Sequence, residues 1–185
     1  MYVLGGAGKA DMSIEQGRFD AAAAAAGIAP SSSSNTRTTG WKAGIGYQFS
    51  STLGVEASYV NFGKTIHYSN PSATTTGVNF RPTSINLFAV PMVPLSNTVG
   101  VFGKAGVAYT RVRADIEETT FTRNSATKIN IAWGFGLESK FSDGLSLRVE
   151  YERFGEAGNT LSFNPNSGTG TGTLSLLSAG LVYRF

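Results

Sequence analysis

The most regular feature of the chain is an alternation between apolar residues and polar or small ones. In the segment 40–49, apolar side chains occupy the odd positions, and lysine, glycine and glutamine occupy the even ones. The segments 128–141 and 145–151 alternate in the same way. Because successive side chains of a β-strand point to opposite faces of the sheet, this period of two predicts strands with one apolar and one polar face.

The alternation predicts eight strands in all. Their approximate ranges are 2–10, 40–49, 53–62, 84–93, 99–110, 127–141, 145–154 and 173–185. Pro91 and Pro94 cannot donate a hydrogen bond to a neighbouring strand, so we expect a bulge or an early end in the fourth strand.

The predicted connections alternate between short and long. The short ones are 50–52, 96–98 and 142–144, and the long, polar ones are 11–39, 63–83, 111–126 and 155–172. Outer-membrane barrels have short periplasmic turns and long extracellular loops, whereas a soluble sandwich has no reason to sort its loops by end. The predicted fold is therefore all-β. It is an eight-stranded antiparallel up-and-down transmembrane β-barrel, a single domain over residues 1–185 with both termini in the periplasm.

Composition supports a barrel and excludes other classes. Only 15% of the residues are charged and 23 are glycine, while no stretch approaches about 18 consecutive apolar residues, so no transmembrane helix is predicted. There is no cysteine, which excludes disulfides and thiolate metal sites. The net charge of +3 is small and the basic residues are dispersed, so we expect no nucleic-acid partner.

The apolar face of each strand is predicted to meet lipid. An eight-stranded barrel fills its interior with side chains, so the face with glycine and charge is predicted to point inward. Aromatic residues cluster near strand ends, as in the interfacial girdles of such barrels. The predicted girdle comprises Tyr2, Trp41, Tyr47, Phe49, Tyr59, Tyr109, Phe141 and Tyr151, together with Tyr183 and Phe185. The alternative is a soluble sandwich with these aromatic residues in its core.

Five charged residues are predicted to share one layer of the lumen. Counting upward from the short turns gives similar heights for Glu56, Lys104, Glu138, Arg148 and Glu150. Buried charges have to be paired. We therefore predict that Arg148 pairs with Glu138 and Glu150, and Lys104 with Glu138 or Glu56.

A second charged group is predicted higher in the lumen, where Lys9 or Lys42 could reach Glu152. Two interpretations of the charged interior stay open. It is either a gate for ions, or polar filling that holds the barrel closed.

Little in the sequence indicates catalysis. His67 is the single histidine, and with Ser69 it has the His-x-Ser spacing of outer-membrane lipid A deacylases. The carboxylate that would orient such a histidine is missing nearby, because the next acidic residue is Asp115. We therefore expect no catalytic, cofactor-binding or metal-binding residues.

Three segments carry a resemblance to a known family: 54–59 (GVEASY), 148–151 (RVEY) and 176–185 (LLSAGLVYRF). The chain resembles the OmpA-type transmembrane domain family. The resemblance implies a monomeric barrel with a polar interior and a gate-like network, in which Glu56, Glu138 and Arg148 match three of the four family positions. The fourth falls near Val90, which is not a lysine.

The resemblance also implies that the barrel-assembly machinery recognises the last strand during biogenesis. The residues of this assembly signal would be Leu181, Tyr183 and Phe185.

The expected function follows from the barrel and its loops. We expect a non-enzymatic protein of the Gram-negative outer membrane, surrounded by lipid and lipopolysaccharide. It would support envelope integrity and contact a host or surface ligand through four polar loops. The alternatives are a narrow, low-conductance channel for ions or solutes, and a lipid-modifying enzyme.

Overall fold

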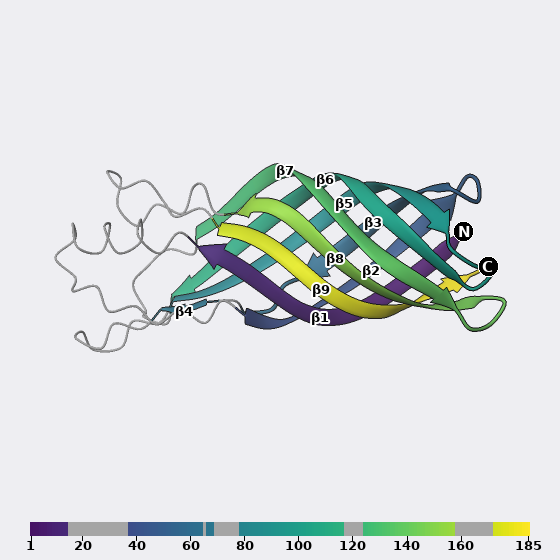
Figure 1. Ribbon diagram of the computed structural model, residues 1–185. Coiled ribbons are helices and arrows are strands. Elements are labelled where there is room, and N and C mark those ends of the chain that lie inside the picture. Colours follow the sequence, from purple (N-terminus) through teal and green to yellow (C-terminus); the bar gives the residue numbers. More distant parts are fainter. Residues whose placement is uncertain (15–36, 65, 69–77, 117–123, 158–171) are drawn as a thin grey trace.

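The strands form one closed antiparallel sheet (Figure 1). This computed structural model describes residues 1–14, 37–64, 66–68, 78–116, 124–157 and 172–185. The strands are β1 (Tyr2–Ile14), β2 (Arg37–Gln48), β3 (Leu53–Asn61), β4 (Ile66–Tyr68), β5 (Val78–Pro94), β6 (Val99–Ile116), β7 (Asn124–Lys140), β8 (Leu145–Ala157) and β9 (Gly172–Arg184). The described residues include no helix that is long and apolar enough to cross a membrane.

The sheet closes into the predicted eight-stranded barrel. Its order is β3-β2-β1-β9-β8-β7-β6-β5, and β5 pairs back onto β3. The short β4 continues β3 along the same neighbour, β5. At the seam, β1 pairs with β9 from Tyr2↔Arg184 to Ile14↔Gly172, and the Phe185 amide donates to the Met1 carbonyl at 3.1 Å. The eight-stranded prediction is therefore confirmed.

The strands extend further toward the long connections than predicted. β5 begins at Val78 instead of 84, and β6 ends at Ile116 instead of 110. The added residues alternate as well, but with the faces exchanged: Arg81 and Arg113 are exposed, whereas Pro82 and Val112 are buried. The prediction followed the apolar outer face of these two strands, which ends at Ile85 and Tyr109, so it stopped short of them.

The expected bulge or early end at the prolines of β5 is wrong. β5 continues to Pro94. Its pairing with β6 is interrupted between Ala89↔Ala105 and Met92↔Phe102, but the register is the same before and after the interruption. Proline removes one N–H group but fixes a φ that an extended strand tolerates. The Met92 amide after Pro91 donates to the Thr52 carbonyl at 2.8 Å, so pairing toward β3 is kept.

A bulge occurs instead in β8. The register between β8 and β9 shifts between Arg153 and Glu156, and Gly155 has a φ of 74°. Glycine adopts this left-handed conformation without the cost that a side chain adds. Beyond Trp133↔Arg153 the ladder between β7 and β8 ends, and Asn130 Nδ2 donates to the Glu156 carbonyl at 2.6 Å across the gap.

The outer face of the barrel is apolar, as predicted. Large apolar side chains are exposed on every long strand, and Ile131 is the most open of them at 81%. Within the described chain, the lumen holds buried charged, hydroxyl and amide side chains together with apolar ones. A soluble sandwich would bury the apolar face, so the structure excludes it.

Two residues of β1 point the opposite way from the prediction. Tyr2 was expected in the girdle but lies inside at 4% exposure, whereas Lys9 was expected in the lumen but is exposed on the outer face. The reason is the run 5–8 (GGAG), whose small residues give no sign of which face is inward. A one-residue error in assigning the faces reverses every side chain of a strand.

The other predicted girdle residues lie on the outer face. Ring pairs occur at both ends of the apolar band. Trp41 contacts Tyr59 at 5.5 Å between ring centroids, and Tyr183 contacts Phe185 at 5.1 Å. Tyr151 is half-buried because it packs against Trp133 and Phe135.

Gly106→Ala should destabilise the barrel, because a Cβ at this position would lie 1.9 Å from the Leu87 carbonyl oxygen of β5. We expect a loss on the order of 2–3 kcal/mol in the free energy of unfolding, the range of overpacked sites. Urea unfolding in detergent micelles measures it. Gly103→Ala is the matched control on the same strand, where the nearest atom is Pro91 Cγ at 3.6 Å. Equal midpoints for the two variants would contradict this account of the packing between β5 and β6.

Candidate functional site: the charged lumen

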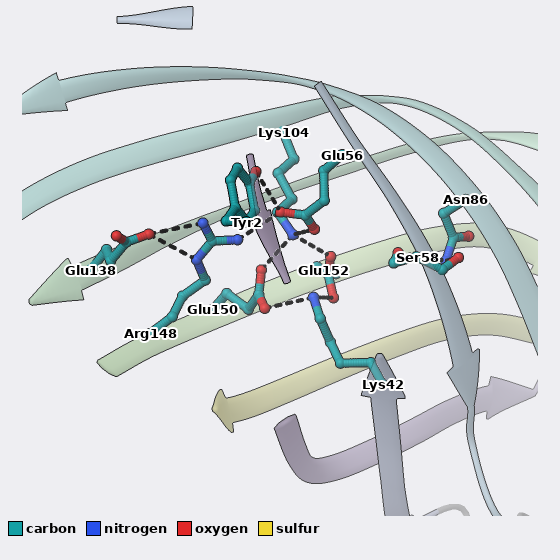
Figure 2. A network of polar contacts seen from close by, with 10 residues as sticks. All are labelled: Tyr2, Lys42, Glu56, Ser58, Asn86, Lys104, Glu138, Arg148, Glu150 and Glu152. Atoms are coloured by element: carbon teal, nitrogen blue, oxygen red, sulfur yellow. Dashed lines mark hydrogen bonds and ion pairs between the residues drawn. The ribbon is translucent and has the colours of Figure 1, made fainter. Parts of the chain in front are cut away.

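The middle of the lumen holds a connected set of buried charges (Figure 2). They project inward from β2, β3, β6, β7 and β8, which alternate them with lipid-facing residues. Each is at most 5% exposed: Lys42, Glu56, Lys104, Glu138, Arg148, Glu150 and Glu152. Charges so deeply buried are tolerated only when they are paired and hydrogen-bonded.

Arg148 joins two carboxylates from opposite parts of the network. Its Nη1 donates to Glu56 Oε2 at 2.6 Å, and its Nη2 donates to Glu138 Oε2 at 2.8 Å. The guanidinium also lies over the Phe102 ring, 4.5 Å from its centroid. The Tyr2 hydroxyl donates to Glu56 Oε2 at 3.2 Å. Tyr2, which was predicted on the outer face, is therefore a member of this group in the lumen.

The two lysines share the remaining carboxylates. Lys104 Nζ contacts Glu56, and lies 2.6 Å from Glu150 and 3.0 Å from Glu152. Lys42 Nζ lies 2.5 Å from Glu150 and 2.8 Å from Glu152. Glu150 Oε2 has this close contact with Lys104 but no well-aligned hydrogen bond, so its pairing is mainly coulombic.

Charge balances across this network. Arg184 at the end of β9 adds a fourth cation, with its Nη2 2.5 Å from Glu138 Oε1. The four carboxylates Glu56, Glu138, Glu150 and Glu152 thus meet the four cations Lys42, Lys104, Arg148 and Arg184. A neutral network avoids the large cost of an unpaired buried charge.

The structure brings together some predicted pairs and separates others. Arg148 meets Glu138, Lys104 meets Glu56, and Lys42 meets Glu152. Lys104 was expected to pair with Glu138 or Glu56, and it pairs with Glu56. The expected pair Arg148–Glu150 is not among the salt bridges of the described residues, in which Glu150 pairs with the two lysines instead. Lys9 takes no part, because it lies on the outer face. Heights counted along single strands do not include the stagger between strands, which decides the partners.

Arg184 is a member of this site that the sequence analysis missed. It lies between Tyr183 and Phe185, which were assigned to the assembly signal. Those two residues and Leu181 are exposed on the outer face. The alternation of β9 therefore already implied an inward Arg184, because its neighbours on both sides face outward.

Oxygens of Glu56, Glu150 and Glu152 lie within 4.8 Å of one another, a spacing that suits a metal ion. Lys104 Nζ contacts all three carboxylates, and Lys42 Nζ contacts two of them. The ammonium groups thus occupy the positions that a cation would take. The arrangement is a salt-bridge cluster.

A layer of neutral polar groups lies beside the charges, as Figure 2 shows at Ser58 and Asn86. Asn86 Nδ2 donates to Ser58 Oγ at 3.3 Å, and Ser84 Oγ donates to Asn86 Oδ1 at 2.6 Å. These buried hydroxyl and amide groups satisfy one another by hydrogen bonding.

Apolar side chains close the lumen toward the long connections. Phe62 at the end of β3 meets Phe154 of β8 edge to face, at 5.1 Å between ring centroids. Neighbouring strands add Met12, Val60, Val112, Leu174 and Leu176, each at most 4% exposed. At the turn end, a cavity of about 10 Å³ lies beside Tyr2 and Arg184, room for roughly one water molecule.

His67, the single histidine of the sequence, lies in the strand β4. Its backbone pairs with Asn79 of β5, and its side chain and Ser69 lie outside the described residues.

Comparison with known proteins identifies the family. The family model described as "Outer membrane protein beta-barrel domain" matches residues 2–185. The chain belongs to this outer-membrane barrel family. It is an outer-membrane protein, and the OmpA-like resemblance is consistent with the match. No curated protein matches the chain.

Solved outer-membrane barrels share the fold of this family member. Neisserial surface protein A has a TM-score of 0.63 at 17% identity, with 100% of this chain and 96% of that chain covered. Ail, the attachment invasion locus protein of Yersinia pestis, in complex with the heparin analogue sucrose octasulfate, has a TM-score of 0.54 at 14% identity, with 98% of each chain covered. Identities this low establish the fold alone.

Substitutions in the network should rank by the number of deeply buried cations that lose a partner. Glu56→Ala removes a partner of both Lys104 and Arg148, so we expect a loss of about 3–5 kcal/mol in the free energy of unfolding. Glu138→Ala should cost less, because only one of its two cations, Arg148, is deeply buried, whereas Arg184 is 20% exposed.

Urea unfolding in detergent micelles tests this order. Glu156→Ala is the control. Its ion pair with Lys128 is exposed, so a change below about 1 kcal/mol is expected. An unchanged midpoint for Glu56→Ala would refute the role of the network in holding the barrel together.

Proposed function

We propose that this protein is a non-conducting, non-enzymatic barrel of the outer membrane, which supports the envelope and presents its long connections for surface contacts. The observation that carries the proposal is the filled lumen. Any ion path along the axis has to pass a neutral network of paired charges and then an apolar layer.

Two physical costs oppose conduction through this lumen. An ion entering the charged layer would have to replace salt bridges whose members are at most 5% exposed, and it would leave their partners unpaired. An ion crossing the layer of Phe62 and Phe154 would lose its water without gaining a polar ligand. The charged interior therefore fits the interpretation as filling that holds the barrel closed.

We also propose that both termini face the periplasm and the long connections face outward. The short connections near 50–52, 96–98 and 142–144 lie at the same end as Met1 and Phe185 (Figure 1). In outer-membrane barrels the short turns are periplasmic. The exposed Leu181, Tyr183 and Phe185 of the last strand would then be presented to the assembly machinery, and the folded barrel would remain a monomer in lipid.

Planar bilayers containing the refolded protein should show no steady single-channel openings in potassium chloride, because side chains fill the lumen. Heat-modifiable migration of the same proteoliposomes on gels confirms that folded barrel was inserted. Steady openings of the unmodified protein that disappear or change ion selectivity in Arg148→Ala would instead establish a channel through the network.

Labelling of intact cells tests the orientation. The chain has no cysteine, so a single introduced thiol reports its own location. A membrane-impermeant maleimide should label Ser33→Cys, in the first long connection, and should label Ser142→Cys, in a short turn, only after the cells are lysed. The reverse pattern would overturn the proposed orientation.

A further inference from the structure

The outer face of the barrel carries a group of cations at one place. Arg111 and Arg113 project outward from β6, and Arg81 projects outward from the neighbouring β5, all three exposed. The register sets Arg81 directly opposite Arg113, and Thr83 opposite Arg111. We call these three residues the arginine patch.

The arginine patch continues the lipid-facing surface of the same two strands. Below it, the outward pairs are Ile85↔Tyr109 and Leu87↔Val107, all of them exposed apolar or aromatic side chains. Tilted strands rise by about 2.5 Å per residue, so Arg111 and Arg113 lie roughly 5 and 10 Å above Tyr109. Tyrosines mark the membrane interface, which sets the arginine patch at the level of the lipid headgroups.

Arg81 and Arg113 bring two positive charges to directly opposite positions of the sheet. Like charges directly opposite each other on paired strands destabilise a sheet. Among the described residues, the side chains of Arg111 and Arg113 have no recorded ion pair or hydrogen bond within the chain. A further cation, the exposed Lys64, lies after the end of β3, whose last pair with β5 is Asn61↔Thr83.

Two exposed arginines of other strands contact polar groups of the protein. Arg37 lies 3.8 Å from Asp11, and Arg153 Nη2 donates to Thr173 Oγ1 at 3.5 Å. Arg111 and Arg113 differ from these two, because their side chains have no such contact among the described residues.

We propose that the arginine patch binds the phosphate groups of lipid A, the anionic glycolipid anchor of lipopolysaccharide in the outer leaflet. The planar guanidinium matches phosphate oxygens with two parallel N–H donors. A bound phosphate accepts hydrogen bonds from the exposed Arg111 and Arg113, while the acyl chains of the same molecule lie along Ile85, Leu87 and Val107. The assignment to the outer leaflet rests on the orientation proposed above.

Titration of the folded barrel in neutral detergent micelles with purified bis-phosphorylated lipid A tests the site. The unmodified protein should bind and gain thermal stability. The double variant Arg111→Gln/Arg113→Gln should bind about tenfold more weakly, a modest loss for two charge-assisted contacts. The matched control is Lys9→Gln/Arg153→Gln, which removes the same charge from β1 and β8 and should bind like the unmodified protein.

Three further arms identify the recognised group. Lipid A without phosphates should bind the unmodified protein and the arginine variant equally, and inorganic phosphate at the same concentration should give no stabilisation. Added salt should reduce the difference between the two proteins, because these charges are exposed. The variant Arg113→Glu, which keeps an exposed polar side chain, should weaken binding further than Arg113→Gln.

Equal affinity of the arginine variant and its control for bis-phosphorylated lipid A would overturn the proposal, as would undiminished binding of the dephosphorylated lipid. Because these titrations use detergent-solubilised protein, their outcome is independent of the orientation in cells and of conduction. A failure of the arginine patch is therefore distinguishable from a failure of the proposed function.

Discussion

Backbone N–H and C=O groups find no water in hydrocarbon, so a sheet that crosses a membrane has to close on itself. Here the closure is made by β1 and β9, which pair along their whole lengths. The seam brings backbones very close: a Cβ on Gly8 would lie 1.9 Å from the Leu177 carbonyl oxygen. The small residues of β1 thus allow the close backbone contact at the seam. They also leave this strand with little apolar surface of its own.

Closure around eight strands leaves a narrow interior, and lipid outside requires apolar side chains there. At the level of the apolar band, charged residues therefore have only the lumen to occupy, and there they form a neutral set. The same constraint makes β8 central, because Arg148, Glu150 and Glu152 follow one another along its inner face. One strand contributes three of the paired charges, and the partners come from β2, β3, β6 and β7.

The sequence predicted what depends on a period of two and on loop length. Both are local, so the strand number, the short turns and the inward charges of β2, β3 and β6 to β8 could be derived. The prediction failed for features that depend on contacts between strands. The small residues of β1 give no sign of which face is inward, so Tyr2 and Lys9 were assigned to the wrong faces. Because neighbouring strands are staggered, Glu150 pairs with Lys42 and Lys104 and not with Arg148. The extended ends of β5 and β6 alternate with the faces exchanged, polar outward and apolar inward at 81–82 and 111–113, so they did not continue the lipid-facing pattern.

Arg184 and Tyr2 lie at the two chain ends, and each contacts a carboxylate of the central network. An unfinished sheet without β9 would bury Glu138 with one cation fewer, and one without β1 would leave Glu56 without its hydroxyl partner. The final rung of the seam, Tyr2↔Arg184, therefore joins backbone closure to charge neutralisation. As a result, the partly assembled barrel is penalised electrostatically as well as by its open edge, which favours an all-or-none transition during folding.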